Sequence, residues 1–92
     1  MKYRAPKHHQ IDKRAPSLLV QIKVGNPNDE FDYEQLAELT GLSIYFFRHG
    51  RYKGWGPHLF PASDGKYKAT RSALTAWLQE RARHWYLREL QQ

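Results

Sequence analysis

The feature that most restricts the fold is a pair of short helical segments separated by only three residues, Gly41 to Ser43. Asp32 is a good N-cap for a helix over residues 33–40, and Gly41 can end that helix in the left-handed conformation. Ser43 can cap a second short helix over residues 44–49. Two short helices joined so tightly must cross each other, so a helix-turn-helix is predicted.

Residues near this turn meet the packing demands of the motif. Ala37 is small enough for the crossing, Leu42 is expected in the core, and Phe47 falls on the inner face of the second helix. Gly50 is expected to close that helix. An ordinary helical hairpin with a glycine turn is the alternative. The residues then predicted to point outward are Ile44, Tyr45, Arg48 and His49.

The segments before the motif have different compositions. Residues 1–16 are polar and basic, contain Pro6 and Pro16, and are predicted to form a flexible arm. Residues 17–24 alternate between apolar and other side chains, a period of two that is typical of a half-buried strand. The turn-forming residues of 25–29 end that strand.

A hairpin and a long helix are predicted after the motif. Residues 57–61 and 66–70 can form two short strands joined by residues 62–65, which contain an Asp-Gly turn sequence. Thr70 is a plausible cap for the final helix, whose inner stripe has three- and four-residue spacing. The members of that stripe are Leu74, Trp77, Leu78, Arg81, Ala82 and Trp85.

The predicted fold class is therefore α+β. We expect a small winged helix-turn-helix with a two- or three-stranded antiparallel sheet and a C-terminal helix, three-stranded if residues 18–24 pair with the hairpin. The domain is expected to span residues 17–92, after the arm of residues 1–16. A length of 92 residues leaves little room for a second domain.

Charge is segregated along the chain, which has a formal net charge of +6. Residues 25–42, with the first helix, carry acidic side chains and no basic one. Residues 43–68, with the second helix and the hairpin, are basic apart from Asp64. A helix that approaches phosphates needs such a basic surface, whereas the helix behind it does not. A solvated basic surface that only keeps the protein soluble is the alternative.

Several classes of function have little support. The chain has no cysteine, and its histidines lack metal-ligand spacing, so neither a metal nor another cofactor is expected. No nucleophile elbow, phosphate loop or paired carboxylates indicate an enzyme or a small-molecule substrate. No apolar run is long enough to cross a bilayer, and the basic N-terminus lacks the apolar stretch of a secretion signal. The expected location is the cytoplasm, in association with the nucleoid.

Three segments together resemble a known family. Residues 36–43, the hairpin around residues 64–67 and residues 72–78 are similar to the excisionase and MerR-like winged-helix proteins, above all to excisionases of phages and integrative elements. The resemblance covers roughly residues 31–80. It implies a second helix that enters the major groove and a hairpin, the wing, that follows the backbone or the minor groove. It also implies a protein that bends DNA beside an attachment site and helps an integrase run in the excision direction.

The resemblance transfers roles to single residues. Ser43 matches the helix cap, Phe47 the buried anchor and Arg48 the basic groove residue of the family. Gly50 stands where a longer recognition helix would carry another apolar anchor. The wing strand is matched by Lys66, Tyr67 and Lys68.

The candidate DNA contacts differ in what they would bind. Arg48 can hold guanine O6 and N7 through two hydrogen bonds, or be an exposed solvating arginine. Ile44 and Tyr45 can touch a thymine methyl or a sugar, or be core residues. Lys66 and Lys68 would contact phosphates on a shared strand face while Tyr67 packs inward, or would protect the hairpin edge from aggregation. The full set of predicted contacts is Ser43, Ile44, Tyr45, Arg48, His49, Arg51, Tyr52, Lys53, Lys66 and Lys68, of which Arg51, Tyr52 and Lys53 follow the helix and would contact phosphates.

The predicted function is sequence-specific binding of double-stranded DNA, as an excisionase-like recombination directionality factor. A transcriptional regulator of a phage or mobile element and a small DNA-packaging subunit are alternatives. A protein-interaction module is the alternative of a different class. Possible partners besides DNA are a second copy or an integrase. The cations of the N-terminal arm are expected either to enter the minor groove or to form a solvating tail; they are Lys2, Arg4, Lys7, Lys13 and Arg14. At the C-terminal end, Trp85, Tyr86 and Leu90 are expected either to seal the first strand or to contact another protein.

Overall fold

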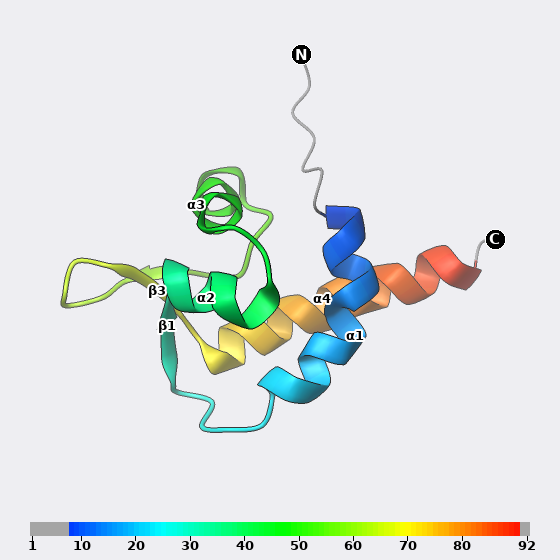
Figure 1. The fold of residues 1–92 in the computed structure, drawn as a ribbon, viewed down its shortest axis with the longest axis horizontal. Helices are drawn as coiled ribbons and strands as arrows, with labels where there is room; N and C mark the ends of the chain where they lie inside the picture. Colours follow the sequence, from blue (N-terminus) through cyan, green and yellow to red (C-terminus); the bar gives the residue numbers. More distant parts are fainter. Residues whose placement is uncertain (1–7, 91–92) are drawn as a thin grey trace, which may run out of the picture.

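The computed structural model describes residues 8–90 as a helical layer packed on a small sheet and a helix-turn-helix (Figure 1). The predicted α+β class, with an antiparallel sheet and a C-terminal helix, is confirmed. In chain order the elements are α1 (His8–Ile22), β1 (Glu30–Asp32), α2 (Tyr33–Thr40), α3 (Ile44–Lys53), β2 (Phe60–Pro61), β3 (Tyr67–Thr70) and α4 (Arg71–Leu90).

The sheet has three antiparallel strands in the order β1-β3-β2. Residue Lys68 of the central strand pairs with Asp32 of β1 on one side and with Phe60 of β2 on the other. The sheet thus has the larger of the two expected numbers of strands, but its third strand comes from residues 30–32, and residues 18–24, named as the possible source of a third strand, do not pair with the hairpin. We refer to β2, β3 and the turn between them, residues 60–70, as the wing.

The first helix, α1, corrects two predictions. Residues 8–16 are helical instead of a flexible arm, and residues 17–24 are not a strand, because the helix continues through Pro16 to Ile22. Residues 1–7 of the predicted arm lie outside the described residues. The cause is a stripe of apolar residues at helical spacing, which begins inside the segment taken as an arm. Its buried members are Ile11, Ala15, Leu18 and Ile22.

This stripe packs along α4, so that the first and last helices of the described chain lie side by side (Figure 1). The predicted inner stripe of α4 is confirmed at Leu74, Trp77, Leu78 and Ala82, all of which are buried. Thr70 caps α4 as expected, since its hydroxyl accepts a hydrogen bond from the backbone N–H of Ala73.

Two arginines of this helical layer have structural partners. Arg81 forms an ion pair with Asp12, across the contact of α4 with α1. Arg14, expected as an arm cation for DNA, donates a hydrogen bond of 2.7 Å to the carbonyl oxygen of Thr40 at the end of α2. The cation thus satisfies a free carbonyl at the negative end of that helix.

The predicted helix-turn-helix is present as α2 and α3. Asp32 accepts a hydrogen bond from the backbone N–H of Gln35, whose side chain binds back to Asp32, and this reciprocal pair fixes the start of α2. Gly41 ends α2 with φ of 77°, in the left-handed region that glycine adopts without strain. Ser43 caps α3, and Phe47 is buried as expected.

The second helix is longer than predicted. Gly50 does not close α3, which continues to Lys53 and ends at Gly54. Gly50 is buried inside the helix, where an added Cβ would lie 3.0 Å from Nε1 of Trp55 and 3.2 Å from the backbone nitrogen of Gly56. The glycine therefore makes room for the loop after α3, and its role is close packing.

Candidate nucleic-acid interface

The outward face of α3 carries three of the predicted DNA contacts. The side chains of Tyr45 and Tyr52 are 62% and 72% exposed, and Arg48 is exposed between them along the helix. On the opposite face Phe46 and Phe47 pack in the core beside Trp77. This division lets α3 present polar and aromatic groups to a partner while its inner face holds it in place.

Some of the other predicted contacts at α3 also have structural roles or are half-buried. The Ser43 hydroxyl accepts a hydrogen bond of 3.0 Å from the backbone N–H of Phe46, so it serves first as the helix cap. His49, expected to point outward, is half-buried between the rings of Tyr45 and Trp55. Ile44 is half-buried and lines a groove beside the helix, and Lys53 is exposed at the end of α3.

Arg51 lies at the centre of a cluster of tyrosines. Its Nε donates a hydrogen bond of 3.1 Å to the hydroxyl of Tyr33 at the start of α2. Its guanidinium carbon is 3.9 Å from the ring centroid of Tyr67 in the wing and 4.5 Å from that of Tyr52. The hydrogen bond to Tyr33 raises the pKa of Arg51 above its ordinary value, so the guanidinium stays charged. Arg51 therefore connects α2, α3 and the wing.

The wing lysines are paired with carboxylates. Lys66, 60% exposed, lies 3.6 Å from Asp32, and Lys68, 22% exposed, lies 3.0 Å from Asp64. The hydrogen bond to Asp64 raises the pKa of Lys68 above its ordinary value. Tyr67, expected to pack inward, is half-buried against Arg51. Contact with phosphates would require the two lysines to exchange the half-buried carboxylate of Asp32 and the exposed carboxylate of Asp64 for phosphate oxygens.

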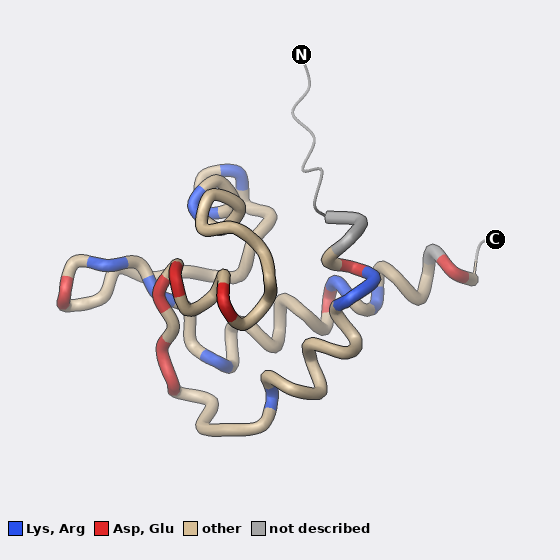
Figure 2. The backbone as a smooth tube through the Cα atoms, in the orientation of Figure 1, with Lys and Arg blue, Asp and Glu red and all other residues tan. Residues whose placement is uncertain are grey.

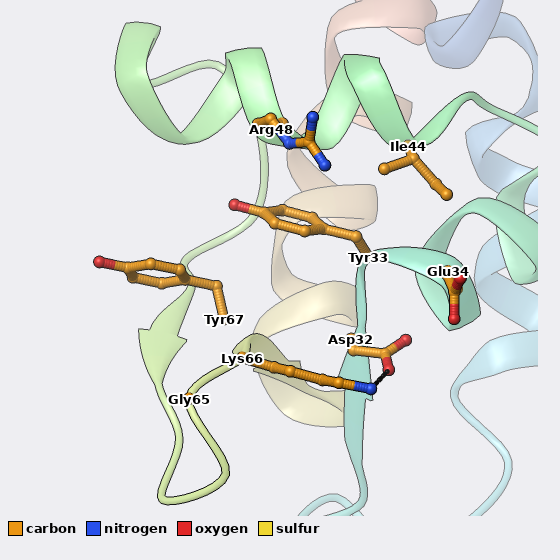
Figure 3. A pocket seen from close by; sticks show the side chains of 8 residues that line it. All are labelled: Asp32, Tyr33, Glu34, Ile44, Arg48, Gly65, Lys66 and Tyr67. Carbon is orange, nitrogen blue, oxygen red and sulfur yellow. Dashed lines mark ion pairs between the residues drawn. The ribbon is translucent and has the colours of Figure 1, made fainter.

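A groove of about 330 Å³ separates α3 from the wing (Figure 3). Arg48 and Ile44 lie on its α3 side, and Lys66 and Tyr67 on its wing side, with Tyr33 between them. The Arg48 guanidinium is 5.8 Å from the Tyr33 ring centroid, within the range of a cation–π contact. The groove is thus continuous with the outward face of α3.

The two helices of the helix-turn-helix differ in charge (Figure 2). The basic residues of α3 are Arg48, Arg51 and Lys53, whereas α2 carries Glu34 and Glu38. Within residues 8–90, neither Arg48 nor Arg51 is within ion-pair distance of a carboxylate. The other arginines that do have carboxylate partners are Arg71 with Asp29, Arg81 with Asp12, and Arg83 with Glu80.

The chain ends give a mixed result. Lys13 is exposed on α1, and the arm cations Lys2, Arg4 and Lys7 lie outside the described residues. Trp85 is half-buried, whereas Tyr86 and Leu90 are exposed at the end of α4. They cannot seal a first strand, because that segment is helical. A contact with another protein stays a prediction for this end of α4.

Two further features are absent from the described residues. No cluster of histidine and carboxylate side chains there could hold a metal ion. No helix within residues 8–90 has the length and apolar character to cross a membrane.

Two residues of this face were not predicted as contacts. The sequence predicts Tyr33 only as the first residue of a helix and Tyr67 as a residue of the wing strand that packs inward. Spacing along the chain cannot reveal that Arg51 brings them together, since the three residues come from different elements. Their only sequence signal is the high proportion of aromatic residues, 14% of the chain.

No protein-family model, curated protein or solved structure matches this chain. Geometry and charge therefore have to support any function assigned to it.

Proposed function

We propose that this protein binds double-stranded DNA in a sequence-specific manner, with α3 as the recognition helix. The observation that carries the proposal is the state of Arg48, which is exposed on the outward face of α3 and has no carboxylate partner within residues 8–90. An arginine in this position can donate two hydrogen bonds to guanine in the major groove. The neighbouring Tyr45 can contact a thymine methyl group or a sugar.

The surroundings of Arg48 favour this orientation on DNA. The recognition helix carries Arg48, Arg51 and Lys53 and no acidic residue. The acidic residues Glu34 and Glu38 are on α2, and of these Glu34 lines the groove beside α3. The wing lies on the other side of the groove beside α3, where Lys66 can contact the DNA strand that borders the major groove. Lys68, on the same strand of the wing, is proposed as a second backbone contact. Base recognition and backbone contacts then come from adjacent elements of one face.

We further propose an excisionase-like role, at the nucleoid, on the resemblance of residues 31–80 to that family. In this role the protein would bind and bend DNA next to an attachment site and direct an integrase. A transcriptional regulator or a small DNA-packaging subunit would use the same contacts. The neighbouring genes distinguish the three roles: an integrase gene, a divergent promoter or a large terminase gene.

The proposal of DNA binding is tested by selecting duplexes from randomised DNA and measuring their affinity by fluorescence anisotropy over a salt series. We expect a selected duplex to bind about 10³-fold or more tightly than an unselected one, with affinity that falls steeply as salt rises. If no duplex is enriched and binding vanishes at physiological salt, the proposal is wrong. Binding of a protein partner at the exposed end of α4 would then be the alternative function.

A further inference from the structure

The groove between α3 and the wing has a mouth formed by two tyrosine hydroxyls. The rings of Tyr33 and Tyr67 extend in the same direction, and their hydroxyl groups lie on the same side of the groove (Figure 3). Arg51 joins the two, since it donates to the Tyr33 hydroxyl at 3.1 Å and stacks on the Tyr67 ring at 3.9 Å. Three elements thus bring the polar ends of these side chains to one place.

The groups at this mouth are hydrogen-bond donors. A hydroxyl can accept a hydrogen bond and still donate its own hydrogen, so Tyr33 remains a donor after accepting from Arg51. Only one of the five N–H groups of the Arg51 guanidinium is used in that bond. Tyr67 contributes a second O–H, and Arg48 lies over the Tyr33 ring. Such a set of donors, two of them on cations, matches the acceptor oxygens of a phosphate.

The carboxylates that line the groove lie elsewhere in it. Asp32 is at its base, where it accepts from the Gln35 backbone and pairs with Lys66. Glu34 also lines the groove, on the α2 side. The tyrosine hydroxyls point away from both carboxylates (Figure 3). An anion at the mouth would therefore lie closer to Arg48 and Arg51 than to the carboxylates of Asp32 and Glu34.

We infer that this mouth holds one phosphate of the DNA backbone, with hydrogen bonds from the hydroxyls of Tyr33 and Tyr67 and from Arg51. The inference rests on the proposed function, because it needs α3 in the major groove. The DNA strand at the edge of the major groove would then pass between α3 and the wing, and one of its phosphates would meet the three donors. Arg51 is held by its stacking and its hydrogen bond before DNA arrives, so little side-chain freedom is lost on binding.

Tyr67→Phe tests the inference with the least disturbance. The substitution keeps the ring that stacks on Arg51 and removes only the hydroxyl. We expect affinity to fall about 5-fold for selected and unselected duplexes alike, since a hydrogen bond to a phosphate carries no sequence information. The salt dependence should stay the same, because no charge is removed. Tyr86→Phe, at the exposed end of α4, is the matched control and should bind as the wild type does.

A second measurement locates the phosphate. Single phosphates of the selected duplex are replaced one at a time by neutral methylphosphonates, and each duplex is titrated with the wild type, Tyr67→Phe and Tyr33→Phe. We expect one backbone position at which the wild type loses clearly more affinity than Tyr67→Phe. Tyr33→Phe should show the same difference at the same position. At other positions the losses should be equal for the three proteins.

The outcomes separate this inference from the proposed function. If the wild type binds a selected duplex tightly but Tyr67→Phe binds equally well, the inference is wrong and DNA binding stands. Equal losses for wild type and variant at every methylphosphonate position overturn it in the same way. If the wild type itself enriches no duplex, both the function and the inference fall, and this is seen before any variant is measured.

Discussion

Asp12 of α1 and Arg81 of α4 form an ion pair in the interior of the helical layer. Oδ1 of Asp12 and Nη1 of Arg81 are 3.4 Å apart, and the Asp12 side chain is only 1% exposed. A charge this deeply buried is costly unless it is paired. Each charge of this pair therefore depends on the presence of the other.

Loss of one partner should destabilise the fold strongly. We expect Asp12→Ala to lower the free energy of unfolding by about 3 kcal/mol, because the Arg81 charge stays in the interface without its counterion. The double variant Asp12→Ala/Arg81→Met should recover most of the loss. Urea unfolding followed by tryptophan fluorescence measures both. A loss well below 1 kcal/mol in the single variant would contradict the role given to the pair.

Gly50→Ala tests why a glycine lies inside α3. Alanine gains about 1 kcal/mol from its helix propensity, but overpacking costs about 1–3 kcal/mol, since the new Cβ would meet Trp55 and the backbone of Gly56. We expect a net loss of about 1 kcal/mol and a changed environment of the Trp55 ring. Thermal unfolding and fluorescence spectra check the two effects. A stabilised variant with an unchanged spectrum would show that the loop moves freely.

The tip of the wing gives a prediction about pH. A hydrogen bond from the Lys66 backbone, and then one from the Lys68 side chain, holds the pKa of Asp64 below its ordinary value of 3.8. The stability from these bonds is therefore present above pH 3.8 and is lost as the pH falls through the lower folded-state pKa. The carboxyl carbon shift of Asp64, followed by NMR, should titrate below 3.8 and move back toward that value in Lys68→Gln. A midpoint at or above 3.8 in the wild type would contradict the assignment.

Replacement of a wing lysine should weaken DNA binding without changing specificity. For Lys66→Gln or Lys68→Gln we expect similar losses on selected and unselected duplexes, and a salt dependence reduced by about one unit. Lys66 should give the larger effect, because it is more exposed and its ion pair is longer. Anisotropy titrations over several salt concentrations measure this. A loss confined to the selected duplex would place the lysine on a base instead.

Local chemistry made part of the fold predictable. Asp32, Gly41, Ser43 and Thr70 all cap or end helices as expected, because caps depend on residues only a few positions apart. The first helix was missed because Pro16 and the polar composition of residues 1–16 hid a stripe that begins at Ile11. Within residues 17–24 alone, the apolar residues fit a period of two, although Val20 and Val24 are exposed in the structure.

The candidate site was predictable only where one element supplies it. The exposure of Tyr45 and Arg48 follows from the inner position of Phe47 on the same helix. The cluster around Arg51 could be predicted only from the register of the sheet and the crossing of two helices, and neither can be derived from local spacing. The end of α3 was misplaced for a similar reason, because a distant loop explains Gly50.

The most direct test of base recognition by α3 is the specificity of Arg48→Ala. The exposed side chain can be removed without disturbing the core. Affinities of wild type and variant are measured on the selected duplex and on a series in which each base pair is changed in turn. We expect a loss of about 1–3 kcal/mol on the selected duplex and loss of discrimination at one base pair. An equal loss on every duplex, or no loss at all, would contradict base recognition by α3.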